Sequence, residues 1–204
     1  MAPPPIADPA TCPLPERTPV EGGEPAASVV ALVGNPRRNS RTRELTEHLS
    51  ARLVDALGLP GTALRVVDLA EFGGAVLDGS PAVDEALATV TSASVLVAAT
   101  PVYKASYTGL LKSFLDRLGG AALRGVAAVP MTVAGAPIHR LVADVHLRPL
   151  LVELGASTPT RAFAVEEAVL ADPAAVVEEW VLSEAPTLAR MLRAVDSTEF
   201  VATR

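Results

Sequence analysis

Five short apolar runs recur along the chain, separated by segments in which the apolar residues have helical spacing. The runs are nearly continuous and rich in β-branched residues, as expected of strands that are buried on both faces. They cover residues 29–33, 62–69, 94–99, 126–133 and 158–165. The spacing between the runs predicts helices over residues 42–57, from about residue 81, and over residues 106–118, 137–154 and 172–194.

Strands that alternate with helices predict an α/β protein whose parallel sheet is covered on both faces. Five strands and five helices fit a flavodoxin-like, doubly wound sheet with the strand order 2-1-3-4-5. In such a sheet, ligands bind beyond the carboxyl ends of the strands, at the switch point between strands 1 and 3. Pro130 lies inside the fourth run, and because proline donates no ladder hydrogen bond, we expect a β-bulge there.

The two ends of the chain depart from this pattern. Residues 1–27 hold eight prolines and few large apolar side chains, so this segment suits neither a helix nor a central strand. We therefore interpret residues 1–27 as a disordered, proline-rich arm and residues 28–195 as the folded domain. Residues 196–204 are expected to form a C-terminal tail.

Composition excludes several classes of function. The chain has 204 residues, 50% of them hydrophobic, which suits one domain with a sizeable core. Its formal net charge of −6 argues against a nucleic-acid partner. Cys12 is the only cysteine, so one chain can form neither a disulfide nor a cysteine metal site. The three histidines lack a carboxylate-rich setting, and we expect no metal.

Localisation follows from what the sequence lacks. No apolar run reaches the roughly 18 residues that a membrane span needs. The N-terminus has no basic region followed by an apolar core, as a secretory signal would. We expect a cytoplasmic protein that does not bind membranes.

The first loop, residues 34–42, joins the first strand to the first helix and is rich in polar groups. A helix N-terminus presents free backbone N–H groups and the positive end of the helix dipole, which favour an anion. The loop adds cations and side-chain donors: Asn35, Arg37, Arg38, Asn39, Ser40, Arg41 and Thr42. It has neither the Gly-Lys pair of a Walker loop nor the three glycines of a dinucleotide fingerprint. We interpret it as a phosphate-binding loop; the alternative is a plain helix cap at Ser40 or Thr42 with solvated arginines.

The second loop, residues 100–107, follows the third strand and should lie beside the first loop. Its backbone could meet the polar edge of a flat ring, and Lys104 could offset negative charge on that ring; the alternative is a half-buried Tyr103 and a solvated Lys104. The third loop, residues 133–137, contains Gly135, where a planar ligand can approach the backbone closely. A phosphate cradle and two ring-binding loops at one switch point suit FMN.

Two segments carry a resemblance to a known family. Residues 34–42 resemble the phosphate loop of the NADPH-dependent FMN reductase family. Residues 99–116, Ala-Thr-Pro-Val-Tyr-Lys-Ala-Ser-Tyr-Thr-Gly-Leu-Leu-Lys-Ser-Phe-Leu-Asp, look closely like its flavin-ring loop and the helix that follows. The match is best to the reductase components of two-component alkanesulfonate monooxygenases and covers about residues 28–165. The resemblance implies NAD(P)H-dependent reduction of FMN, a homodimer or homotetramer, and delivery of reduced flavin to a partner flavin-dependent monooxygenase.

The resemblance also assigns site residues by position. It implies that Arg37, Ser40 and Thr42 bind the FMN phosphate, with Asn35 where the family often has serine. It also implies that the isoalloxazine ring is bordered by six residues: Pro101, Val102, Tyr103, Lys104, Ala134 and Gly135. Hydride passes from the nicotinamide to flavin N5, so the protein must align two rings and stabilise negative charge at the N1–C2=O edge. We expect the backbone N–H groups of residues 102–104 to do this. The side chain of Lys104 is the one catalytic candidate.

Three points stay open at the level of sequence. Some family members have an inserted aromatic residue that puts a π-bulge in the fourth helix, whereas this chain has Val145 or His146 near that place and no tyrosine. NADPH and NADH both remain candidates, since Arg37, Arg38 or Arg41 could instead meet a 2′-phosphate. The alternative functions are a quinone, azo or chromate reductase that retains FMN, a non-enzymatic flavodoxin-like electron carrier, and a binding module.

Overall fold

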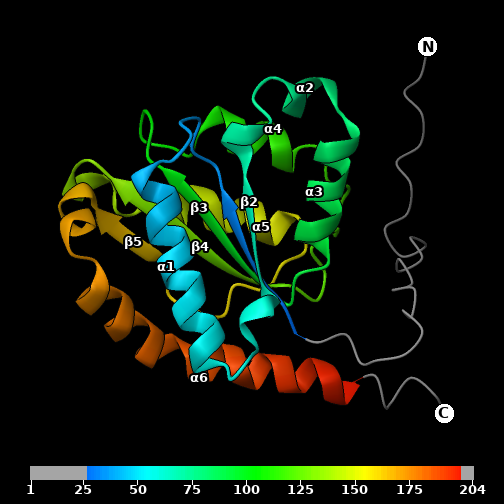
Figure 1. Cartoon of the computed structure of the whole chain (residues 1–204), viewed down its shortest axis with the longest axis vertical. Coiled ribbons are helices and arrows are strands. Elements are labelled where there is room, and N and C mark those ends of the chain that lie inside the picture. Colours follow the sequence, from blue (N-terminus) through cyan, green and yellow to red (C-terminus); the bar gives the residue numbers. More distant parts are fainter. Residues whose placement is uncertain (1–26, 199–204) are drawn as a thin grey trace.

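A five-stranded parallel sheet forms the centre of the molecule (Figure 1). The computed structural model describes residues 27–198. The strands lie in the order β2-β1-β3-β4-β5, which confirms the predicted doubly wound, flavodoxin-like topology. They span Val29–Val33 (β1), Leu64–Asp68 (β2), Val95–Pro101 (β3), Ala127–Ala134 (β4) and Phe163–Glu166 (β5).

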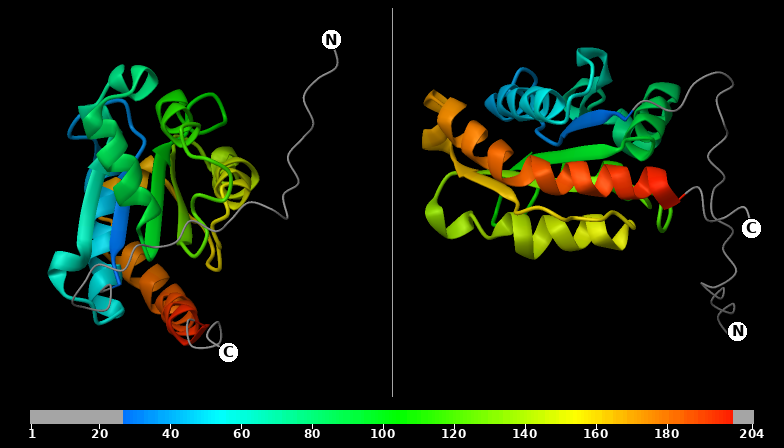
Figure 2. Two further views of the ribbon diagram at one scale, coloured as in Figure 1. Left: turned by 90° about the vertical axis from the view of Figure 1, so that its right-hand side faces the viewer. Right: turned by 90° about the horizontal axis from the view of Figure 1, so that it is seen from below.

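Helices cover both faces of this sheet (Figure 2). Helices α1 (Arg41–Ala56) and α6 (Ala174–Thr198) pack on one face. Helices α3 (Pro81–Thr91), α4 (Gly109–Leu115) and α5 (Arg148–Glu153) pack on the other. A short helix, α2 (Ala75–Asp78), lies in the glycine-rich link before α3. Each face has its own apolar core because successive strand residues point to opposite sides.

Aliphatic side chains fill most of the two cores, as the aromatic content of 3% requires. Leu32, Leu49 and Leu111 are fully buried, and each contributes about 1.5–3 kcal/mol by leaving water. Phe163 of β5 packs edge-on against Trp180 of α6, with 5.7 Å between the ring centroids. These contacts pack both faces of the sheet, and the three loops follow the carboxyl ends of its strands β1, β3 and β4.

Pro130 lies in β4 without the predicted bulge, since the pairing with β3 is continuous across it. The N–H of Ala127 points to the β3 side and the N–H of Ala128 to the β5 side. The nitrogen of Pro130 therefore also points to the β5 side. Pairing with β5 begins only at Met131, so no ladder bond is lost. The expectation of a bulge is wrong, because it took no account of where the neighbouring strand starts.

The helix predicted over residues 137–154 is interrupted. A 3₁₀ turn spans Pro137–His139, and a π-helix spans Ala143–Leu147 before α5. The Arg148 N–H bonds the carbonyl of Ala143, five residues earlier. Pro149 accounts for the change, because it has no N–H and its ring would meet the carbonyl four residues earlier in a regular α-helix. A π-helix thus forms in this chain without an inserted tyrosine.

Two other helices differ from their predicted bounds. Helix α4 begins at Gly109 and not at residue 106, because Thr108 is its N-cap and accepts the Leu111 N–H at 3.2 Å. Its leucines and Phe114 face the core. Helix α6 runs on to Thr198 with Pro186 inside it.

Residues 1–26 and 199–204 are outside the described part of the chain. The expectation of a disordered arm, most of the predicted C-terminal tail and Cys12 therefore lie outside the described residues. Within residues 27–198, none of the helices combines the length and the apolar character that crossing a bilayer demands.

Candidate functional site

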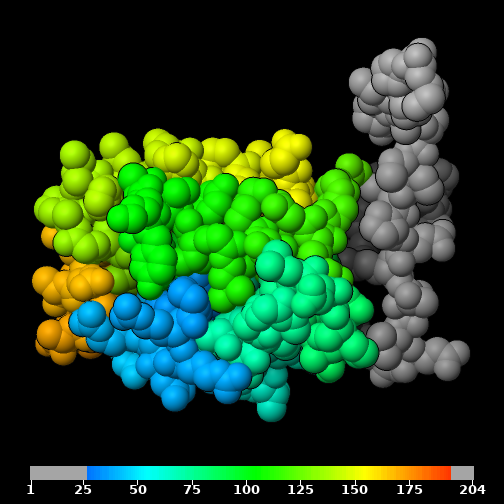
Figure 3. Space-filling view, turned by 90° about the horizontal axis from the view of Figure 1, so that it is seen from above, coloured from blue at the N-terminus to red at the C-terminus, as the bar shows by residue number. Residues whose placement is uncertain are grey.

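The first and second loops meet where β1 and β3 end. The Gly34 N–H donates to the Ala99 carbonyl at 2.7 Å, and the Thr108 hydroxyl donates to the Gly34 carbonyl. Seen from above, the blue segment after β1 lies against the green segment after β3 (Figure 3). The adjacency that the strand order predicts is present.

Gly34 sits too close to α4 to carry a side chain. A Cβ at this position would lie 2.6 Å from the Cβ of Leu111. Thr108 is buried, and its hydroxyl bridges the end of β1 to the first turn of α4. Sequence reasoning did not single out Thr108; the available signal was a threonine followed by glycine at the start of an apolar helical stretch.

Side chains within the first loop hold its shape. Asn35 is only 6% exposed. Its Oδ1 accepts the Arg37 N–H at 2.9 Å, and its Nδ2 donates to the Thr42 hydroxyl at 3.0 Å. Ser40 caps α1, since its Oγ accepts the Arg43 N–H at 3.2 Å. The Ser40 and Thr42 hydroxyls act here as acceptors, so each retains its O–H to donate.

The three arginines of the first loop differ in their partners. Arg38 donates to the Glu71 carbonyl at 3.3 Å, and Arg41 forms an exposed ion pair with Glu167 at 3.5 Å. The side chain of Arg37 has no hydrogen-bond or ion-pair partner among residues 27–193, whose side chains the structure describes. Arg37 is thus the cation of this loop whose guanidinium is unengaged in the described part of the chain.

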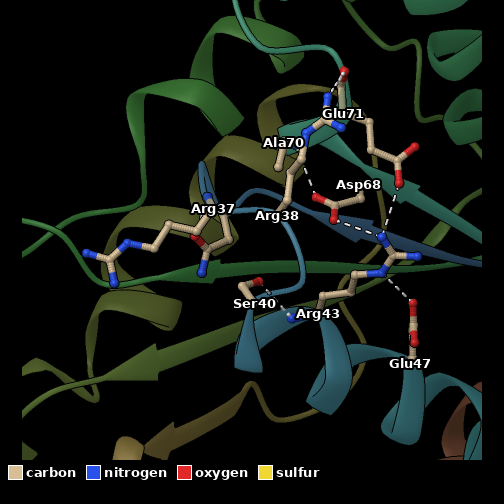
Figure 4. A network of polar contacts seen from close by, with 9 residues as sticks. Arg37, Arg38, Ser40, Arg43, Glu47, Asp68, Ala70 and Glu71 are labelled. Atoms are coloured by element: carbon tan, nitrogen blue, oxygen red, sulfur yellow. Dashed lines mark hydrogen bonds and ion pairs between the residues drawn. The ribbon is translucent and has the colours of Figure 1, made fainter.

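A fourth arginine, Arg43 in the first turn of α1, forms a network that sequence reasoning missed (Figure 4). Its Nε donates to Glu47 at 2.7 Å, and one terminal nitrogen donates to Asp68 and to Glu71, both at 3.1 Å. The hydrogen bond to Glu47, with smaller contributions from Glu71 and Asp68, raises the pKa of Arg43 although burial opposes it. Only the Glu47 contact, four residues along one helix, was visible in the sequence.

The second loop folds into a tight hairpin turn. Tyr103 and Ser106 exchange backbone hydrogen bonds of 2.9 and 3.0 Å. Lys104 and Ala105 between them have φ values of 51° and 61°, as in a type I′ turn. Such angles are unusual for residues other than glycine and cost about 1 kcal/mol each. The turn pushes Lys104 outward, where its side chain is exposed.

Because of this turn, not every backbone N–H group of residues 102–104 is available to a bound ring. The Val102 N–H donates to the Val133 carbonyl at 2.8 Å, and the Tyr103 N–H donates to Ser106. Among the described residues, nothing accepts the Lys104 N–H. Of the three N–H groups expected to face a ring, Lys104 supplies the unengaged one.

The third loop begins at a buried position and opens outward. Ala134 is the last residue of β4, fully buried and paired with Glu166 of β5. Gly135 is exposed, and a Cβ built on it meets no atom within 4 Å. The bond from Val102 to Val133 ties this loop to the second one. Gly135 therefore borders open space, whereas Ala134 has no exposed surface.

Two cavities lie elsewhere on the molecule. One of about 490 Å³ lies between α1 and α6, and one of about 820 Å³ lies between the π-helix and the link before β5. Neither contains a residue of the first or second loop, although Pro137 at the end of the third loop lines the larger one. The polar groups described above gather at the junction of the first and second loops.

Comparisons with known proteins agree with this geometry. A family model described as NADPH-dependent FMN reductase matches residues 27–169. The NADH-dependent FMN reductase SfnE of Pseudomonas putida is 38% identical over 149 residues, which are 71% of this chain and 80% of that protein. An FMN reductase (NADPH) of Escherichia coli (strain K12) is 33% identical over 156 residues, 74% of this chain and 75% of that protein. The apo form of the NADH:FMN oxidoreductase EMOB superposes with a TM-score of 0.68 at 34% identity, over 82% of this chain and 89% of that one.

Proposed function

The chain belongs to the NADPH-dependent FMN reductase family, and on this premise we propose that it reduces FMN with NADPH or NADH at the junction of the first and second loops. One observation carries the location. The hydrogen bond from Thr108 to Gly34 joins a loop suited to a phosphate to a loop suited to a flat ring. FMN, a flat ring with a phosphate tail, requires two such loops side by side.

The first loop fits the phosphate end of FMN. Helix α1 has 16 residues and presents its N-terminus to this loop, so backbone N–H groups and the helix dipole favour an anion there. Arg37 adds an unengaged guanidinium, and Ser40 and Thr42 add hydroxyl donors. Asn35 acts on the loop itself, because both ends of its amide are bonded within residues 35–42.

The second and third loops fit the ring end. Residues 101–104 border one side and Ala134 and Gly135 the other, with the Lys104 N–H and ammonium group free to meet negative charge. Bound FMN supplies the hydride acceptor. The protein's part is to align two rings and to stabilise charge at the N1–C2=O edge, which in this chain falls to Lys104.

Steady-state kinetics test this function. Purified protein is mixed with NADPH or NADH and with FMN, FAD or riboflavin, and oxidation of the nucleotide is followed. We expect FMN to be preferred over riboflavin, because only the phosphate engages the first loop. Absence of nucleotide oxidation with every flavin would rule out the proposed activity.

We also propose that the flavin leaves as reduced FMN for a flavin-dependent monooxygenase in the cytoplasm. The exposure of Tyr103, Lys104 and Gly135 supports this, because a ring lying against them is open to solvent. Passage of the FMN-loaded protein through a desalting column tests it. Loss of the flavin agrees with release, whereas full retention favours a quinone, azo or chromate reductase.

A homodimer or a dimer of dimers completes the proposal. Four apolar residues along the segment from the 3₁₀ turn to α5 are more than half exposed: Ile138 (81%), Leu141 (65%), Val145 (57%) and Val152 (52%). This exposed apolar surface supports pairing of two copies there. The apolar face of α4 is buried in the core, so it does not add to this surface. Light scattering at micromolar concentration tests the assembly, and a monomeric mass would exclude it.

A further inference from the structure

A buried carboxylate lies beside the first loop. Asp68 ends β2 in register with Val33, the last residue of β1, and the next residue after Val33 opens the first loop. The Asp68 side chain is only 1% exposed. Its Oδ1 accepts the Ala70 N–H at 3.1 Å, which fixes its position. An ionised carboxylate here repels any anion that the first loop binds, with little screening by water.

Arg43 is placed to cancel this charge. Its terminal nitrogen donates to Asp68 Oδ2 at 3.1 Å, while its backbone N–H is held by the cap residue Ser40. The two other carboxylates on its guanidinium belong to Glu47 and Glu71, whose side chains are 38% and 56% exposed. Water screens those two, so Asp68 is the acid whose charge most needs a partner.

We propose that Arg43 sets the preference of the site for phosphorylated flavin over riboflavin without touching the phosphate, by neutralising Asp68. The inference rests on the proposed binding of FMN at the first loop. Arg43 is a positioning residue in this scheme, because its guanidinium faces the carboxylates while Arg37 extends in a different direction (Figure 4). Its effect on the phosphate is therefore electrostatic and passes through Asp68.

Four variants separate this role from a merely structural one. Arg43→Met removes the charge and keeps the stem, Arg43→Lys keeps the charge, Asp68→Asn removes the carboxylate charge, and the fourth combines Arg43→Met with Asp68→Asn. The dissociation constants of FMN and riboflavin are measured by flavin fluorescence, and their ratio is the readout. A loss of first-loop structure would also lower this ratio, because only the phosphate engages that loop, but neither added salt nor the added Asp68→Asn change would restore it.

The expected pattern is specific to charge. Arg43→Met lowers the preference for FMN by roughly tenfold, and this loss shrinks as salt is added. Arg43→Lys retains most of the preference. The double variant regains it, because the uncompensated carboxylate is gone. Asp68→Asn alone raises the preference, and it gives a result even if Arg43→Met folds poorly.

Arg52→Met is the matched control, since Arg52 lies on the same helix and is also ion-paired, to Asp55 and Glu178 at the other end. It should leave the ratio unchanged. An unchanged ratio in Arg43→Met, or no recovery in the double variant, would overturn the role of Arg43. If the unmodified protein binds FMN and riboflavin equally, the proposed phosphate site itself fails, and the two failures are distinguishable.

Discussion

The Thr108 hydroxyl donates a hydrogen bond to the Gly34 carbonyl and so joins the first turn of α4 to the end of β1. The same oxygen accepts the Leu111 N–H at 3.2 Å, and the Thr108 N–H donates to the Thr100 hydroxyl at 3.1 Å. One buried side chain thereby fixes the first loop relative to the second. The geometry of the whole site depends on this link.

Replacing Thr108 by valine should weaken both the fold and flavin binding. The change leaves the buried Gly34 carbonyl without its donor and the Leu111 N–H without its cap, a loss of about 1–3 kcal/mol in the free energy of unfolding. FMN and riboflavin should suffer alike, since the whole site shifts. Urea unfolding and flavin titration measure the two effects; Thr108→Ser, which keeps the hydroxyl, is the control and should retain most of both.

Alanine at position 34 should lower the stability of the fold, whereas alanine at position 135 should not. The new methyl group at position 34 meets Leu111 at 2.6 Å, and overpacking of this kind costs about 1–3 kcal/mol of stability. The methyl group at position 135 meets nothing within 4 Å, so stability should be unchanged. If a ring lies beside Gly135, Gly135→Ala binds flavin more weakly while its melting temperature stays the same. Only this one of the two variants should combine these two results. Unchanged affinity there would remove Gly135 from the site.

Arg37→Met should weaken FMN by roughly 10- to 100-fold, since a charge-assisted hydrogen bond contributes about 1.5–3 kcal/mol. Riboflavin, which lacks the phosphate, should bind as before. Arg41→Met is the matched control, because Arg41 carries the same charge in the same loop but pairs with Glu167. Equal losses for both flavins in Arg37→Met would place the phosphate elsewhere.

Lys104→Met separates chemistry from binding. If the ammonium group stabilises charge that develops as the flavin is reduced, hydride transfer slows by about tenfold while oxidised FMN binds as before. Stopped-flow reduction and flavin titration give the two quantities. Lys112→Met on α4 serves as the control for a lost lysine. An unaltered rate in Lys104→Met would assign the role to the backbone N–H of Lys104 instead.

The fold was predictable because its signals are local or follow from general rules of connection. Each strand is a short β-branched run, and the strand order follows from alternating strands and helices. The break at residues 140–148 was harder to predict, because Pro149 also suits the first turn of a helix. The bulge predicted at Pro130 is absent because the effect of a missing N–H depends on which neighbouring strand that position faces. The sequence does not show this; it follows from how the strands pair in the sheet.

The site was predictable in its residue types but not in its partners. The sequence of the first loop predicts an anion-binding site, but it does not indicate that the side chains of Asn35 and Thr42 form a hydrogen bond with each other. The pair of Arg43 and Asp68 joins residues 25 positions apart on different elements. Whether a polar group is free to bind a ligand depends on such long-range hydrogen bonds. The spacing of residues in the sequence does not predict them.

The most direct test of the proposed function is anaerobic mixing of the purified protein with FMN and either NADPH or NADH, with the absorbance of oxidised flavin followed in time. We predict that the protein speeds the loss of this absorbance with at least one nucleotide. We also predict that FMN reacts faster than riboflavin at low flavin concentration, and that Arg37→Met removes this difference. Flavin reduction no faster with the protein than without it, for both nucleotides, would contradict the assignment.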